Sequence, residues 1–182
     1  MPILRLCSET SQYLDALVDI STQGLLEDLT RYGRGERDQR IIKLTETTRF
    51  EGIAKGYSKT TLDFMVEDQT PVALLRAEAS RGSTIQMANI DWITVLHQYR
   101  NKGLGRQMLT HYIDSSRSDD VDLVTLGVHE GNPAKRLYES LGFRKIRESE
   151  KERIKTMGLP LTERGVAGFV VIAQPTAPAA PP

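Results

Sequence analysis

The fold is decided by residues 91–106, which read DWITVLHQYRNKGLGR. Within this stretch the pattern of apolar residues changes from that of a strand to that of a helix. Ile85–Val95 is rich in β-branched and aromatic residues, which favour a strand. The apolar residues that follow recur at helical spacing: Leu104, Met108, Leu109, Tyr112 and Ile113. The sequence therefore predicts a strand over Ile85–Val95 and an amphipathic helix over Gly103–Arg117.

Another strand is expected after this helix, over Val121–Val128. Strand, helix and strand make a βαβ unit, whose strands run parallel and whose crossover is right-handed. Further strand-like segments lie on both sides of this unit: Ile3–Leu6, Thr61–Val66, Val72–Ala79, Phe143–Glu148 and Ala167–Ala173. The second and third of these meet at Glu67–Pro71, which suits a hairpin turn. We therefore predict an α/β fold with a mixed, mostly antiparallel sheet of six or seven strands and helices on both faces.

Three further helical segments are expected. Ser8–Ile20 has helical spacing, and a second region over Leu25–Thr48 is interrupted near Tyr32–Gly35, where two glycines break the pattern. The third helix is short, over Pro133–Leu141. Its start and end signals agree, since a possible N-cap precedes it and a glycine follows it, at Asn132 and Gly142.

The composition limits the classes of function. The 182 residues include 24 Lys and Arg and 24 Asp and Glu, so the overall charge does not attract nucleic acid or an anionic membrane. No apolar run approaches the roughly 20 residues of a membrane span. The single cysteine, Cys7, excludes an intramolecular disulfide and provides no metal-ligand cluster. We expect one cytoplasmic domain over residues 1–174 without a bound metal, followed by a disordered Pro/Ala-rich tail at 175–182.

The connection between the strand and the helix of residues 91–106 combines glycine with positive charge. It reads RNKGLGR from Arg100 to Arg106. Amide groups at a helix start lack intrahelical partners, and glycine lets a ligand approach them closely. The positive end of a helix favours acidic residues, yet this first turn has none and carries several cations. A bound phosphate would satisfy the amides and the cations together. The alternative is that the glycines only permit a tight turn and the cations are solvated.

Two other phosphate-binding motifs do not fit this loop. The Walker A motif ends in Gly-Lys-Ser/Thr, which is absent here, and the dinucleotide motif requires a third glycine where Met108 stands. The loop therefore needs another explanation.

These residues resemble the GNAT superfamily of acetyltransferases. The central motif of that family is an Arg or Gln, two residues, a Gly, one residue, and a Gly or Ala. Arg100, Gly103 and Gly105 match it. The flanking strand and the second helix of the family also have counterparts here, at Ile93, Val95, Leu137, Tyr138, Gly142 and Phe143. The resemblance covers roughly Ile85 to Arg147.

The resemblance implies that acetyl-coenzyme A is the cosubstrate. The amides from about Arg100 to Gly105 would hold its pyrophosphate, and the backbone of Ile93 and Val95 would pair with its pantetheine arm. The full set of implied coenzyme-binding residues is Ile93, Val95, Arg100, Asn101, Lys102, Gly103, Leu104, Gly105, Arg106, Asn132 and Lys135. The sequence departs from the family at the usual Asn, which would fall at Gly131. Asn132 therefore either contacts the coenzyme or only caps the helix.

Tyr138 corresponds to the general acid that protonates the departing thiolate in this family. The alternative is a core aromatic, because Tyr138 belongs to an apolar stripe with Leu137 and Leu141. Many members carry a Glu base on the second strand, at the position that Gly127 occupies here. Asp91 is the first candidate to replace it, because strict alternation places it on the face of Ile93 and Val95, although a bulge would reverse that. Further candidates for the base are Glu130 and His129.

The sequence therefore predicts an N-acetyltransferase that passes the acetyl group of acetyl-coenzyme A directly to a primary amine in a ternary complex. The acceptor is a small molecule or a protein amine, which the sequence does not distinguish, and a homodimer is common in the family. Two alternatives stay open. One is a non-catalytic module that binds coenzyme A on the same fold, and the other is an enzyme that transfers a different acyl group.

Overall fold

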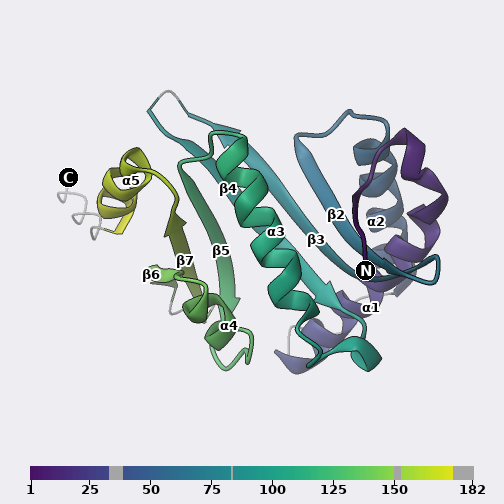
Figure 1. The fold of residues 1–182 in the computed structure, drawn as a ribbon. Helices are drawn as coiled ribbons and strands as arrows, with labels where there is room; N and C mark the ends of the chain where they lie inside the picture. The colour runs from purple at the N-terminus through teal and green to yellow at the C-terminus, as the bar shows by residue number, and fades with distance from the viewer. Residues whose placement is uncertain (33–38, 83, 150–152, 174–182) are drawn as a thin grey trace, which may run out of the picture. The chain divides into compact units, whose positions relative to one another are not determined.

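The computed structural model describes residues 1–32, 39–82, 84–149 and 153–173 (Figure 1). The predicted tail at 175–182 lies outside these residues. The described residues form a seven-stranded sheet in the order β1-β2-β3-β4-β5-β7-β6. The strand pairs β1–β2, β2–β3, β5–β7 and β6–β7 are antiparallel. The prediction of a mostly antiparallel sheet within an α/β fold is confirmed.

The chain divides into two compact units. The first comprises the described residues of Met1–Ala79 together with Ile90–Ser115, and the second comprises Ser80–Asn89 and the described residues from Ser116 onward. The strand β4 (Gln86–Val95) contributes to both units, as does α3 (Leu104–Ser118).

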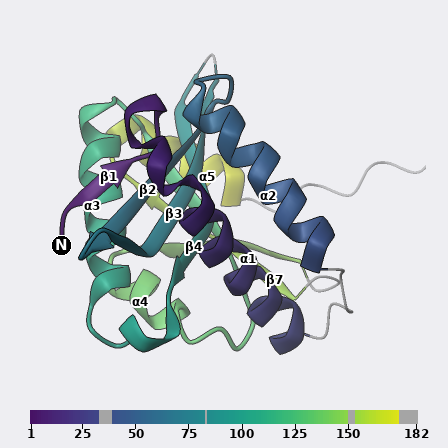
Figure 2. The ribbon, with the colours of Figure 1, turned by 90° about the vertical axis from the view of Figure 1, so that its right-hand side faces the viewer.

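The first unit contains β1 (Ile3–Arg5), β2 (Thr60–Glu67) and, up to Ala79, β3 (Thr70–Arg81). Two helices, α1 (Leu14–Arg31) and α2 (Gln39–Ala54), cover one face of these strands, and the part of α3 in this unit lies on the other face (Figure 2). The prediction of helices on both faces of the sheet is confirmed.

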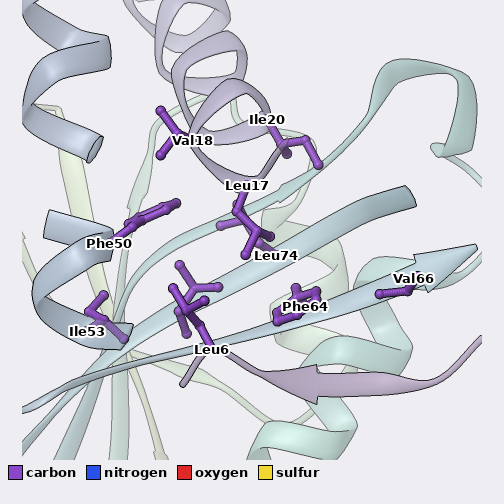
Figure 3. Packing of buried hydrophobic residues seen from close by; sticks show 10 residues of the cluster. Leu6, Leu17, Val18, Ile20, Phe50, Ile53, Phe64, Val66 and Leu74 are labelled. Carbon is purple, nitrogen blue, oxygen red and sulfur yellow. The ribbon is translucent and has the colours of Figure 1, made fainter. Parts of the chain in front are cut away.

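The core of the first unit follows from the alternation of β2. Phe64 and Val66 point to the side of α1 and α2, where they join Leu74 of β3 (Figure 3). Leu62 belongs to the same cluster. From the helices come the side chains that close this cluster: Leu17, Val18, Ile20, Phe50 and Ile53. The predicted apolar stripe of α3 is buried as well, since Leu104, Met108, Leu109, Tyr112 and Ile113 are at most 6% exposed.

The hairpin between β2 and β3 turns through two residues. Glu67 pairs with Thr70, and the residues between them, Asp68 and Gln69, have φ angles of 47° and 63°. Positive φ at both central residues matches the right-handed twist of the strands that they join. The hairpin predicted at Glu67–Pro71 is confirmed.

The amino-terminal helices differ from the prediction in their boundaries. The segment predicted over Ser8–Ile20 begins as a 3-10 helix, η1 (Ser8–Tyr13), and continues as α1 to Arg31. The next helix, α2, begins at Gln39. The predicted break near Tyr32–Gly35 therefore agrees with the end of α1, although residues 33–38 lie outside the described part of the chain.

The second unit contains β5 (Leu123–His129), α4 (Lys135–Ser140), β6 (Arg144–Ser149), β7 (Ile154–Pro160) and α5 (Glu163–Ala173). In Figure 1, β7 lies beside β5 and is followed by α5. The short helix α4 ends as predicted, because Gly142 adopts φ +93° directly after it.

The prediction of a strand over Ala167–Ala173 is wrong, because these residues form the second half of α5. A short apolar run does not by itself distinguish a strand from a buried helix. The helix starts upstream, where the amide of Gly165 donates to Thr162 Oγ1 at 3.1 Å.

The strand that the prediction missed is β7, which lies between β5 and β6. Glycine and proline in its sequence argue against a strand interior. Gly158 is required by packing, since a Cβ atom there would lie 2.5 Å from Ile146 Cδ1 of β6 and 3.2 Å from Phe169 Cδ2 of α5.

None of the helices in the described ranges is long and apolar enough to span a lipid bilayer.

Candidate functional site

The loop from β4 to α3, which is the predicted phosphate site, contains two residues with left-handed φ angles. It runs through a short 3-10 helix, η2 (His97–Tyr99), and then through left-handed φ angles at Asn101 (61°) and Gly103 (81°). Such turns direct successive amide groups to one concave side. The helix α3 begins at Leu104 without an acidic residue in its first turn. A Cβ atom on Gly103 would meet no protein atom within 4 Å, so the space beside this amide is open to a ligand.

The side chain of Arg100 fixes this loop to the rest of the first unit. Its Nε donates to the carbonyl oxygen of Val95 at 2.9 Å, and its Nη2 donates to the carboxylate of Glu27 on α1. Arg100 and Glu27 are each 31% exposed, so the pair is half-buried. The guanidinium therefore holds the loop in shape, and its charge is shared with a carboxylate.

The other predicted coenzyme-binding residues of the loop have distinct surroundings. The Lys102 ammonium lies 4.9 Å from the centre of the Tyr99 ring, in a cation–π contact. Leu104 is 4% exposed, so its side chain belongs to the core and only its backbone is a candidate ligand group. Gly105 and Arg106 follow in the first turn of α3.

The end of β4 packs closely on α1. A Cβ atom on Gly24 of α1 would lie 2.8 Å from Thr94 Oγ1 and 3.2 Å from Trp92 Cζ2. Trp92 and Thr94 therefore face α1, and Ile93 and Val95 face the opposite side by alternation. Both of the latter are half-buried.

Asp91 lies on the side of α1 and α2, not on the side of Ile93 and Val95. Its Oδ2 accepts a hydrogen bond from Arg76 Nε at 3.0 Å. Arg76 faces α2, because it pairs with the core residue Leu62 and donates through Nη1 to Glu46 at 2.8 Å. Strict alternation along β4 is thus interrupted, which agrees with the predicted alternative of a bulge.

A buried polar network supports Asp91. Glu46 of α2 is 2% exposed, and its Oε2 accepts from Ser21 Oγ of α1 as well as from Arg76. Its Oε1 accepts from Arg49 Nη1 at 3.2 Å. These hydrogen bonds satisfy a carboxylate that burial would otherwise strongly disfavour.

Burial raises the pKa of Asp91 above its usual value, and the Arg76 guanidinium opposes this shift. The Asp91 side chain is 37% exposed, so it also reaches solvent. Among the described residues, no side chain donates to its second oxygen, Oδ1. A carboxylate with a raised pKa and an available oxygen can accept a proton from a ligand.

Tyr138 lies on α4 in the second unit and is 6% exposed. Its ring contacts Phe143 edge to face, with the ring centres 6.1 Å apart. The backbone reinforces this contact, because the amide of Phe143 donates to the carbonyl of Tyr138 at 3.1 Å. The ring is therefore held rigidly, as both the catalytic and the core interpretation of Tyr138 require.

The remaining predicted residues of the second unit have structural partners. The side chain of Asn132 accepts from the amide of Ala134 at 2.9 Å, so it does cap the turn that leads into α4. Lys135 forms an exposed ion pair with Glu139 at 3.4 Å. Glu130 pairs with Arg153 at 3.2 Å, and His129 ends β5.

Glu46 and Arg76 were not among the site residues predicted from the sequence. A signal for both was present, because each occupies a core position of an apolar pattern: Glu46 between Ile42 and Phe50 on α2, and Arg76 between Leu74 and the buried Ala77. Opposite charges at two such positions indicate a buried ion pair. Their pairing across 30 residues requires the tertiary structure.

Comparison with known proteins identifies the family. A family model described as an acetyltransferase (GNAT) domain matches residues 42–162, which is more than half of the chain. Comparison with curated proteins finds no match.

Three solved structures illustrate the likeness of fold. PaiA N-acetyltransferase from Thermoplasma acidophilum, in complex with coenzyme A, is 15% identical, with a TM-score of 0.64 over 88% of this chain and 99% of the other. Aminoglycoside 6'-acetyltransferase type Ii is 14% identical, with a TM-score of 0.65 over 89% and 98%. A chain of the NatC complex bound to Gag peptide and coenzyme A is 17% identical, with a TM-score of 0.61 over 89% and 100%.

At these identities the solved structures show the fold alone, and the family model carries the assignment. The chain belongs to the GNAT acetyltransferases and is an acyltransferase enzyme.

Proposed function

We propose that this enzyme transfers the acetyl group of acetyl-coenzyme A directly to a primary amine in a ternary complex. The observation that carries the proposal is the loop from Arg100 to Gly105, which precedes α3 with left-handed φ angles, open space beside Gly103 and no acidic residue in the first helical turn. These features suit the pyrophosphate of a coenzyme.

The coenzyme extends from this loop along β4. The pantetheine arm carries amide groups that pair with the backbone of Ile93 and Val95 in the manner of an added strand. Lys102 and Arg106 supply positive charge near the phosphates. The coenzyme A in two of the structurally similar proteins supports this assignment of the ligand.

The transfer step requires a base and an acid. The neutral amine attacks the thioester carbonyl carbon and loses a proton to Asp91, whose raised pKa suits this role. A carbon–nitrogen bond forms, the carbon–sulfur bond breaks, and the thiolate takes a proton from the Tyr138 hydroxyl. Both side chains then exchange protons with solvent, which restores the enzyme for the next cycle.

We further propose that residues 1–174 act as one acetyltransferase domain in the cytoplasm. The family match supports a single domain, because residues 42–162 include parts of both compact units. The balanced charge and the single cysteine support the location.

The proposed function is tested by the release of free thiol from acetyl-coenzyme A in the presence of a panel of amines. The panel should contain aminoglycosides, polyamines, lysine peptides and peptides with an unblocked amino terminus, and mass spectrometry should identify the acetylated product. We expect amine-dependent release with at least one acceptor class. If no amine accelerates release, the proposed function is wrong.

Two additional measurements test the details of this reaction. Direct transfer predicts initial-rate lines that intersect when both substrates are varied, whereas an acetyl-enzyme intermediate gives parallel lines. Propionyl- and succinyl-coenzyme A test the donor, because the phosphates and pantetheine are common to all three. We expect the acetyl donor to have the highest kcat/KM.

A further inference from the structure

We propose that Arg76 and Glu46 are positioning residues that orient Asp91 and control its readiness to accept a proton. This inference rests on the proposed function, since it takes Asp91 as the base of the transfer step.

The guanidinium of Arg76 forms hydrogen bonds with two carboxylates, those of Glu46 and Asp91. Arg76 is 5% exposed on its side chain and donates from two different nitrogens to two carboxylates: Nε to Asp91 Oδ2 at 3.0 Å and Nη1 to Glu46 Oε2 at 2.8 Å. Because the guanidinium is planar and rigid, fixing it against Glu46 also fixes the direction from which it meets Asp91. The orientation of Asp91 is thus determined from a buried position on α2.

The three groups differ in their access to solvent. Glu46 and Arg76 are almost fully buried, whereas Asp91 is 37% exposed on its side chain. A buried ion pair is a weak source of stability, since its desolvation cost offsets much of the attraction. Here Arg76, one member of the buried pair, also contacts Asp91, whose carboxylate reaches solvent. A role in placing that carboxylate accounts for the charges better than stability alone.

The charged groups around Asp91 act on it in opposite directions. Arg76 of β3 and Arg49 of α2 favour its ionised form, as opposite charges at short range do. Glu46 of α2 shares the guanidinium of Arg76, so we expect its negative charge to disfavour the ionised form of Asp91. From α1, the neighbouring group in the network is the uncharged Ser21.

Two substitutions therefore have effects of opposite sign on the pH profile of kcat/KM. Glu46→Gln keeps an oxygen acceptor but removes the negative charge, so the pKa of Asp91 falls and the acidic limb moves to lower pH. Arg76→Met removes the opposing cation, so the limb moves to higher pH. We expect each shift to be about one pH unit. One acceptor amine is used throughout, so that its own ionisation contributes equally to every profile.

Three further variants complete the experiment. Glu51→Gln makes the same charge change on the exposed side of α2, where Glu51 pairs with Lys55, and should leave the profile unchanged. Asp91→Asn should remove the contribution of Asp91 to the acidic limb, leaving that of the amine, together with most of kcat. Arg76→Lys retains the positive charge but lacks the planar guanidinium that donates to two carboxylates at once. We therefore expect kcat to fall, while the acidic limb moves less than in Arg76→Met.

The outcomes separate this inference from the proposed function. If Asp91→Asn retains full activity, Asp91 is not the general base, and this part of the proposed transfer step is wrong. A second outcome is that Asp91→Asn is inactive but Glu46→Gln leaves the acidic limb of the kcat/KM profile in place or moves it to higher pH. In that case the positioning role of Glu46 and Arg76 is wrong, whereas Asp91 remains the general base. Arg76→Met leaves Glu46 buried without its partner and risks unfolding. The Glu46→Gln profile then decides the question alone.

Discussion

The phenol of Tyr138 allows the transfer step to be tested by the removal of one oxygen atom. Tyr138→Phe keeps the ring and its edge contact with Phe143, so the free energy of unfolding should change by about 1 kcal/mol or less. As the proton donor to the thiolate, the hydroxyl should contribute about 10²-fold or more to kcat. Steady-state kinetics and thermal unfolding measure the two effects.

The matched control for this variant is Tyr57→Phe, because Tyr57 is 85% exposed. It should leave kcat unchanged. Should Tyr138→Phe also retain kcat within about twofold, Tyr138 is a core aromatic and another group protonates the thiolate.

Glu27 connects α1 to the predicted coenzyme loop through Arg100, so it affects the affinity for acetyl-coenzyme A. Glu27→Gln loses the charge pair with Arg100, and the loop becomes less ordered before binding. We expect the dissociation constant for acetyl-coenzyme A to rise about threefold, which is typical of a half-exposed ion pair. Calorimetric titration measures this change.

Asp19→Asn is the control for Glu27→Gln, because it removes an exposed carboxylate of the same helix that pairs with Lys43. Its affinity for the coenzyme should equal that of the wild type. Tighter binding by Glu27→Gln would show instead that Glu27 withholds Arg100 from the phosphates.

The sequence predicted the residues of the loop but not the partners of Asp91. The glycines, the positive charges and the absence of an acidic residue are local features, and they are visible in residues 100–106. The contact of Asp91 with Arg76 depends on strand register and on an interrupted alternation along β4, neither of which the local pattern encodes. The network through Glu46 depends further on how α2 packs against β3.

At the scale of elements, α5 is attached to β5 through a position that only glycine fits. A Cβ atom on Gly165 would lie 1.8 Å from the carbonyl oxygen of Asp122, which directly precedes β5. The backbone has to move to relieve this overlap. Gly165→Ala should therefore lower the free energy of unfolding by roughly 1–3 kcal/mol, measured by thermal or denaturant unfolding.

Gly52→Ala provides the opposite case on α2. A Cβ atom there meets no atom outside its own helix within 4 Å, and Gly52 lies inside the helix. The substitution should raise the free energy of unfolding by up to about 1 kcal/mol, because alanine has the higher helix propensity. A destabilised Gly52→Ala together with an unchanged Gly165→Ala would contradict the packing described for both helices.

The elements were predicted well where a long, clear pattern existed and poorly at the carboxyl end. The helix α3 carries a clear period of 3.6, and the strands β2 to β4 have long segments rich in apolar and β-branched residues. The region from Ile154 to Ala173 has no such clear pattern, because β7 contains Gly158 and Pro160, and α5 is rich in β-branched residues in its second half. The number of strands agreed with the prediction, although Ala167–Ala173 had been assigned in place of β7.

In the whole molecule, the proposed catalytic groups and the coenzyme loop lie between Asp91 and Tyr138 and belong to both compact units. Asp91 and the loop from Arg100 to Gly105 belong to the first compact unit, and Tyr138 belongs to the second. The family match includes all of them. The family was predicted from a local motif and is shown by the family model, whereas the packing of α1 and α2 was not predicted from the local pattern.

Binding of coenzyme A by the loop between β4 and α3 can be tested by titration of two matched glycine variants. Gly103 and Gly56 have similar φ angles, 81° and 72°, and a Cβ atom on either would meet no protein atom within 4 Å. Alanine therefore introduces similar backbone strain at both positions, but only Gly103 lies in the loop.

We predict that the wild-type protein and Gly56→Ala bind coenzyme A equally well in calorimetric titrations, and that Gly103→Ala binds it at least about tenfold more weakly, because the added methyl group occupies the space of the phosphates. Absence of saturable binding by the wild type, or equal weakening by both variants, would contradict binding by this loop.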